Sequence, residues 1–143
     1  MHWPQRLLLF AAVATFATAA VLAVSVIPPV RADTFPHATP QRAVPAFWVN
    51  VILNILVAAE AFGSSRLRSG RATPRRVWAG VSGLVALLLG LALMDAATAL
   101  AAHGPAMRGA VVALWVCVCL DLAGGVLMMV SAFMQRTGSP AQA

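Results

Sequence analysis

Four long apolar segments dominate this chain and limit the folds open to it. A helix needs about 20 mostly apolar residues to cross the hydrocarbon core of a bilayer. Only helices and closed barrels satisfy the backbone there, and no stretch of this chain alternates polar and apolar residues as strands do. The sequence therefore predicts an all-α integral membrane protein, a four-helix transmembrane bundle forming one domain over residues 1–143, with spans at residues 7–27, 44–63, 77–100 and 109–133.

The composition agrees with a membrane protein. The chain is 61% hydrophobic and only 10% charged, whereas a soluble domain has about 25% charged residues. So few charges cannot cover a surface that faces water. We therefore expect the lipid bilayer to be the main surroundings of the chain.

The ten basic residues are all arginine, and their distribution predicts the orientation. With four spans, the side that holds both ends of the chain carries seven of them. The other side carries Arg31, Arg42 and Arg108. Cytoplasmic loops hold the excess of positive charge, so we predict that both termini are cytoplasmic and that the membrane is a bacterial-type inner membrane. The seven are Arg6, Arg66, Arg68, Arg71, Arg75, Arg76 and Arg136.

A net charge of +6 is also typical of proteins that bind nucleic acid. Here the arginines flank apolar segments and do not line one folded surface, so we expect no nucleic-acid partner. The loop SSRLRSGRATPRR could hold anionic lipid headgroups, with each arginine contributing roughly 1 kcal/mol. The orientation alone also explains this loop.

The first apolar segment has a second interpretation. Arg6, the apolar run and Val-Arg-Ala before Asp33 fit the pattern of a signal-peptidase site. Signal peptides have a shorter apolar region of about 7–15 residues, so we favour a retained helix. Cleavage would leave three spans with the same loop orientation. The link that follows, PPVRADTFPHATPQR, is rich in proline, and we expect little regular structure in it.

Four polar residues inside the spans predict a polar intramembrane site. Asn50 and Asn54 lie about 40° apart on one helix face, and Asp95 and Asp121 lie in later spans. An ionised aspartate costs about 2.5–3.5 kcal/mol at the centre of a helix, so each should face the bundle interior, stay protonated, or both. From depth alone we predict two contacts, between Asn50 and Asp95 and between Asn54 and Asp121. An amide both donates to and accepts from a carboxyl group.

This polar site has two open interpretations, structural stabilisation or the binding of a proton, an ion or a ligand. Glu60 is different, since it lies near the cytoplasmic end of its span. We expect it to reach the interface or to pair with an arginine of the loop.

Small residues predict close helix packing. Gly83, Ala86 and Gly90 line one stripe of the third span, and Thr15 and Thr18 of the first span could bond across helices or to their own backbone. In the fourth span one broad face carries Cys117, Asp121, Gly124, Gly125 and Met128. These surfaces could close the bundle or bind a partner chain.

The sequence gives no catalytic, cofactor or metal motif. Cys117 and Cys119 lie about 200° apart on a helix, so they cannot share a metal, and we expect buried, inert thiols. His2, His37 and His103 lie outside the spans, which excludes a haem held between helices. A metal site from Asp33, His37 and His103 lacks recognisable spacing, and we interpret these residues as solvated.

We therefore expect a non-enzymatic accessory or assembly subunit that packs against a larger membrane complex or forms a homo-oligomer. The main alternative is a small proton- or ion-coupled transporter that uses Asp95 and Asp121. A further alternative is a membrane enzyme whose lipid-soluble substrate enters an apolar cavity ending at Asn54 or Asp121.

Overall fold

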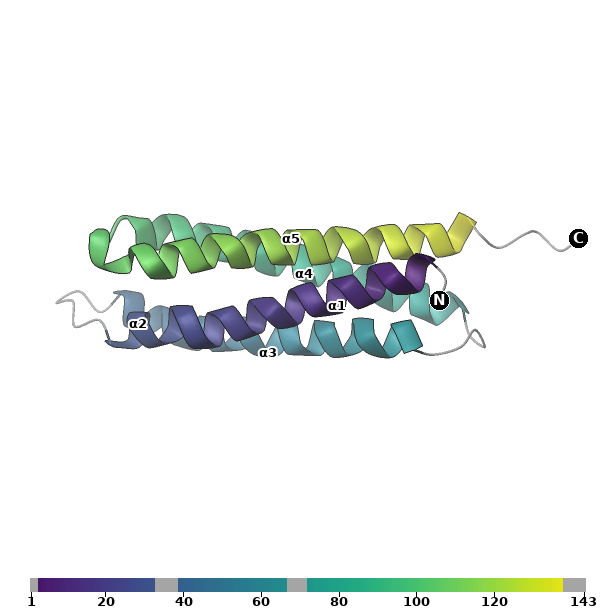
Figure 1. Ribbon diagram of the computed structural model, residues 1–143, viewed down its shortest axis with the longest axis horizontal. Coiled ribbons are helices and arrows are strands. Elements are labelled where there is room, and N and C mark those ends of the chain that lie inside the picture. Colours follow the sequence, from purple (N-terminus) through teal and green to yellow (C-terminus); the bar gives the residue numbers. More distant parts are fainter. Residues whose placement is uncertain (1–2, 33–38, 67–71, 138–143) are drawn as a thin grey trace, which may run out of the picture.

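The computed structural model describes residues 3–32, 39–66 and 72–137, and within these ranges every long element is a helix (Figure 1). Four helices among the described residues are long and apolar enough to cross a membrane, which confirms the predicted all-α class. Each of the four predicted segments lies inside one of them. The helices are α1 (Trp3–Val21), continued by the π-helix η1 (Leu22–Val26) and by α2 (Ile27–Ala32), then α3 (Thr39–Arg66), α4 (Ala72–Ala101) and α5 (Arg108–Thr137).

The helices form an antiparallel ring around a common axis. Helix α1 packs between α3 and α5, and α4 closes the ring by packing closely on α5 and more sparsely on α3. Helices α3 and α5 therefore lie diagonally across the bundle. The start of α1 and the end of α5 lie at the same end, as an even number of passes requires (Figure 1).

The expectation of little regular structure after the first segment is wrong for its described part. The helix continues through Pro28 and Pro29 to Ala32. Proline lacks an N–H group and its ring clashes with the carbonyl four residues earlier. The π-helical turn just before the prolines widens the backbone, with the Ile27 N–H bonded to the Leu22 carbonyl, and so lets the helix pass them.

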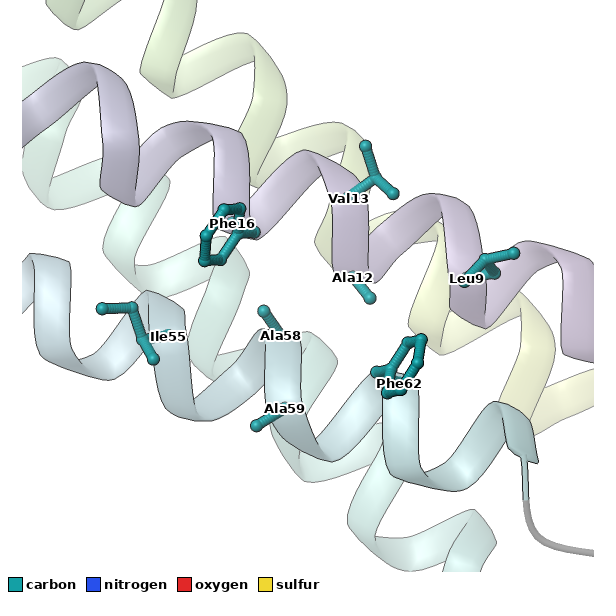
Figure 2. Close-up of a pocket in the computed structure, with 8 residues that line it drawn as sticks. All are labelled: Leu9, Ala12, Val13, Phe16, Ile55, Ala58, Ala59 and Phe62. Carbon is teal, nitrogen blue, oxygen red and sulfur yellow. The ribbon is translucent and has the colours of Figure 1, made fainter.

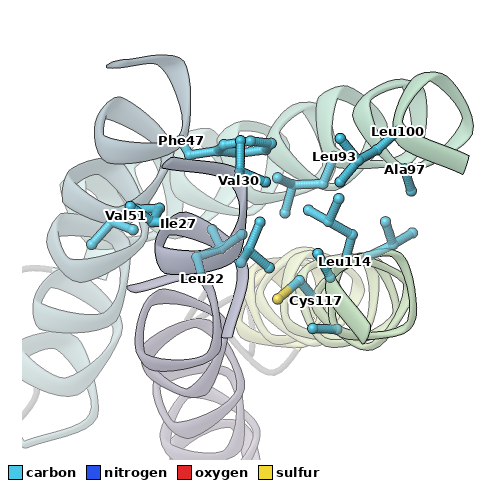
Figure 3. Close-up of a cluster of buried hydrophobic side chains, with 14 of the residues drawn as sticks. Leu22, Ile27, Val30, Phe47, Val51, Leu93, Ala97, Leu100, Leu114 and Cys117 are labelled. Carbon is cyan, nitrogen blue, oxygen red and sulfur yellow. The ribbon is translucent and has the colours of Figure 1, made fainter. Parts of the chain in front are cut away.

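The apolar core consists of two clusters stacked along the bundle axis. One fills the end near α2 and contains Leu22, Val30, Phe47, Leu93 and Leu114 (Figure 3). The other fills the opposite end and includes Leu8, Ala11, Val57, Ala86 and Met128. On every helix a short stretch separates the residues of the two clusters, and the polar site lies at that level.

Glycines bring α5 close to both of its neighbours, as the small-residue pattern predicts. A Cβ atom on Gly125 would lie 2.8 Å from the Gly83 carbonyl oxygen of α4, and one on Gly124 would lie 3.1 Å from Thr15 Cγ2 of α1. Helix α4 then ends in a tight turn at Gly104, whose φ of 94° favours glycine. The single-turn helix η2 (Pro105–Met107) leads from this turn into α5.

Candidate functional site

A layer of polar side chains crosses the bundle where the two apolar clusters adjoin, and its member Cys117 also belongs to the cluster near α2. All but one of its members are 0% exposed, and Asn50 is 7% exposed. Helices α1, α3 and α5 each contribute two residues. We call this set the polar layer: Thr15, Thr18, Asn50, Asn54, Cys117 and Asp121.

The centre of the polar layer is a contact between Asn54 and Asp121. Asn54 Nδ2 donates to Asp121 Oδ2 at 3.3 Å across 67 residues of sequence. Because α3 and α5 lie diagonally, this hydrogen bond passes through the middle of the bundle. The contact predicted from helix depth is therefore present, while a functional role for the pair stays a prediction.

Asn50 belongs to the same layer but is bonded along its own helix. Asn54 Nδ2 donates to Asn50 Oδ1 at 2.7 Å and to the Asn50 carbonyl oxygen at 3.2 Å. The two hydrogens of one amide group thus face three acceptors, counting Asp121. The amide of Asn54 is consequently the main donor at the bundle centre.

Two buried oxygens of the layer remain unpaired, Asn54 Oδ1 and Asp121 Oδ1. The threonine hydroxyls donate to backbone carbonyls of their own helix instead. Thr15 donates to the Ala11 carbonyl at 3.0 Å and Thr18 to the Ala14 carbonyl at 3.3 Å. Leaving a buried acceptor without a partner costs about 1–3 kcal/mol. The layer therefore has a surplus of acceptors.

Helices α4 and α1 both approach Asp121 closely. Gly90 of α4 lies so close that a Cβ atom there would be 3.2 Å from Asp121 Cβ. On the α1 side, the Cys117 thiol lies 3.8 Å from the Thr18 carbonyl oxygen, and the Thr18 side chain is a polar neighbour of the acid. This close packing fixes the position of the acid between all four helices.

The predicted contact between Asn50 and Asp95 is wrong. Asp95 is exposed on the outer surface of α4, and Asn50 faces Asn54 instead. The cause is rotation, because Asp95 lies five residues after the buried Gly90, about 140° around the helix. The glycine stripe of α4 was a signal in the sequence that could have shown this.

Other predicted residues have simple local environments. Glu60 is half-buried and accepts a hydrogen bond from the Ser64 hydroxyl at 3.2 Å, while Arg66 lies over the Phe62 ring at 4.9 Å. Loop residues 67–71 lie outside the described part of the chain.

The two cysteines point to different sides, as predicted, but only Cys117 is buried. Cys119 is exposed on α5, so the expectation of burial is wrong for it.

The described residues contain no group of His, Cys, Asp and Glu that could hold a metal ion. Of the three residues considered as a metal site in the loops, Asp33 and His37 lie outside the described ranges, and the structure describes only His103. The His103 ring lies near the end of α4, with Nδ1 3.0 Å from the Ala99 carbonyl oxygen.

The apolar cavity expected for a membrane enzyme was predicted to end at Asn54 or Asp121. A groove between α1 and α3 opens to the outside of the bundle, but its lining contains neither Asn54 nor Asp121. The arrangement at the bundle centre can hold helices in register or bind a proton.

No known family model, curated protein sequence or solved structure matches this chain.

Proposed function

We propose that this protein is a non-enzymatic accessory or assembly subunit that binds another membrane protein through the outer face of α4. The observation that supports this proposal most directly is the exposure of Asp95 on that face. In the described part of the chain the Asp95 carboxylate has no hydrogen-bond partner. The Thr98 hydroxyl donates to the Asp95 backbone carbonyl at 2.8 Å instead.

An acid at this place needs a partner. Asp95 lies six residues before the end of α4, about 9 Å along the axis, and its short side chain cannot reach far toward water. Charged residues within spans are costly and almost always face other protein or a water-filled cavity. A basic or hydrogen-bond-donating side chain on a neighbouring helix would remove this cost.

The surroundings of Asp95 suit a closely packed helix. Ala92 and Ala99 lie one turn before and after it, and both are exposed. Small residues at this spacing let two helix backbones approach within the membrane. Leu88 and Leu91 extend the same exposed face toward the middle of the span, at 57% and 48% exposure.

We further propose that both ends of the chain are cytoplasmic in a bacterial-type inner membrane. The uneven distribution of arginine supports this orientation, with seven residues on one side and Arg31, Arg42 and Arg108 on the other. In this orientation Asp95 lies in the outer quarter of the membrane. The partner residue would then lie at the same depth.

Replacing Asp95 should remove the partner while the subunit still folds. We expect Asp95→Asn and Asp95→Ala to weaken association by about 2–5 kcal/mol, the usual cost of removing one member of a buried charged pair. The measurement is quantitative recovery of the partner after chemical cross-linking and extraction in a mild detergent. Glu60→Gln is the matched control, because it also removes one carboxylate and lies at the other end of the bundle.

Two results would contradict the accessory role. One is a wild-type chain that purifies without any partner and moves a solute in vesicles. The other is recovery of the same partner at the same yield from Asp95→Ala and from Glu60→Gln. Recovery of a second copy of the chain as the partner would instead assign the α4 face to a homo-oligomer.

A second candidate function is proton or ion binding at Asp121, as part of a small transporter. The unpaired oxygens Asn54 Oδ1 and Asp121 Oδ1 favour it, because they are acceptors that a proton or cation could serve. Asp95 is exposed on the outside of α4, so it cannot act as a second acid on a path for protons or ions through the bundle. We therefore rank this function below the accessory role.

A further inference from the structure

An apolar groove runs along the outer surface between α1 and α3 (Figure 2). Its volume is about 390 Å³, and its lining is entirely apolar side chains from the two helices. Figure 2 shows Ala12 and Ala58 facing each other across the groove, with the Phe16 ring pointing toward α3 and the Phe62 ring toward α1. The alanines leave a narrow slot between two aromatic rings.

Two arginines lie just beyond one end of this groove. Arg66 Cζ lies 4.9 Å from the centre of the Phe62 ring, so the ring that ends the groove also holds a guanidinium. Arg6 precedes the lining residue Leu9 by three positions and is exposed. The rise of a helix places Arg6 about 4.5 Å beyond Leu9 and Arg66 about 6 Å beyond Phe62, so both charges lie at one level.

The nearby acid does not cancel this charge. Glu60 lies about 200° around α3 from Phe62, away from the groove. It is bonded to the Ser64 hydroxyl of its own helix at 3.2 Å. The end of the groove therefore combines an apolar slot with two cations.

We propose that this groove is a binding site for an anionic phospholipid, with one acyl chain between Phe16 and Phe62 and the headgroup phosphate between Arg6 and Arg66. Charge complementarity favours this occupant over a second copy of the chain. A parallel pair of copies joined through this face would bring two sets of the same arginines together. Arginine also suits phosphate, since its planar donors can bind two oxygens.

The test uses the purified full-length protein in nanodiscs of equimolar phosphatidylglycerol and phosphatidylcholine with identical acyl chains. Native mass spectrometry then counts the lipids that stay bound. We expect the wild type to retain one phosphatidylglycerol in preference to phosphatidylcholine. Arg6→Gln and Arg66→Gln should each reduce this preference about fivefold, the effect of one arginine near a lipid phosphate, while Arg66→Lys should largely keep it.

The control for charge is Arg108→Gln, because Arg108 is exposed at the opposite end of the bundle. The apolar slot is tested separately with Ala59→Leu, which fills the groove at an exposed position, against Ala123→Leu on α5. Ala59→Leu should lower retention of both lipids, and Ala123→Leu should not. Circular dichroism verifies that each variant is folded.

The proposal is overturned if the wild type retains both lipids equally, or if the Arg6→Gln/Arg66→Gln double variant keeps the preference seen in Arg108→Gln. Unchanged retention in Ala59→Leu would also exclude the groove as the site. The Asp95 variants should retain lipid like the wild type, since α4 does not line the groove. The proposal of a lipid site and the proposal of a partner surface on α4 can therefore be refuted independently of each other.

Discussion

Gly125→Ala is expected to destabilise the bundle by about 1–3 kcal/mol, the usual cost of forcing an extra carbon into a packed interior. A Cβ atom at Gly125 would lie 2.7 Å from Leu87 Cγ and 2.8 Å from the Gly83 carbonyl oxygen. A backbone atom cannot move aside by changing a rotamer, so α4 and α5 would have to separate. The measurement is unfolding of the protein in mild detergent micelles by added dodecyl sulfate, followed by circular dichroism.

Gly109→Ala on the same helix is the matched control, because nothing lies within 4 Å of a Cβ atom there. Alanine is a better helix former than glycine, so this variant should be neutral or slightly stabilised. Gly83→Ala tests the other side of the contact. The loss of stability in the Gly83→Ala/Gly125→Ala double variant should be smaller than the sum of the two single losses, because both substitutions separate the same helices. Equal stability of Gly125→Ala and Gly109→Ala would contradict the close approach.

The helices and their main packing stripes could be predicted because they depend on composition and period. Runs of about 20 apolar residues require helices in a bilayer, and the described residues form four such helices. Glycines at helical spacing require a close neighbour, and Gly83, Gly90, Gly124 and Gly125 all have one. Neither prediction depends on which helices are neighbours in the bundle.

The polar contacts could be predicted only in part, because depth and rotation are separate quantities. Depth follows from counting residues from the ends of a span, and it placed Asn54 correctly opposite Asp121. Rotation depends on which face each helix buries. On α4 the buried face follows Gly83, Ala86 and Gly90, and Asp95 lies away from that stripe.

The proline-rich link shows a different limit. Pro28 and Pro29 are ordinary signals for the end of a helix. The helix continues past them because a π-helical turn forms over Leu22–Val26, and no single residue in that turn indicates it. The position of such a turn depends on packing against neighbouring helices, which the sequence alone does not give.

Asn54→Leu is expected to be strongly destabilising, by about 1–3 kcal/mol, because it leaves Asp121 buried without the amide that donates to it. Asp121→Asn should be neutral or stabilising. It keeps the shape of the side chain and adds a donor to a layer in which Asn54 Oδ1 is unpaired. Unfolding by dodecyl sulfate, as for the glycine variants, gives the free energies.

The single variant Asp121→Leu and the double variant Asn54→Leu/Asp121→Leu complete a double-mutant cycle with Asn54→Leu. Replacing both partners by apolar groups can be nearly neutral, so the double variant should be more stable than Asn54→Leu alone. The coupling energy should be about 0.6 kcal/mol and at most about 1.7 kcal/mol, the range for polar pairs in bilayers. A coupling of zero would show that Asn54 and Asp121 do not act as a pair.

The same Asp121→Asn variant separates the two candidate functions, because asparagine does not titrate. A subunit whose polar layer only fixes helix packing should keep its abundance and its partner when Asp121 is replaced in this way. If the protein is a transporter that binds a proton at Asp121, the Asp121→Asn variant should fold normally and lose pH-dependent flux in vesicles. If Asp121→Asn abolishes flux while Asp95→Ala leaves every association intact, the bundle centre and not the α4 face carries the function.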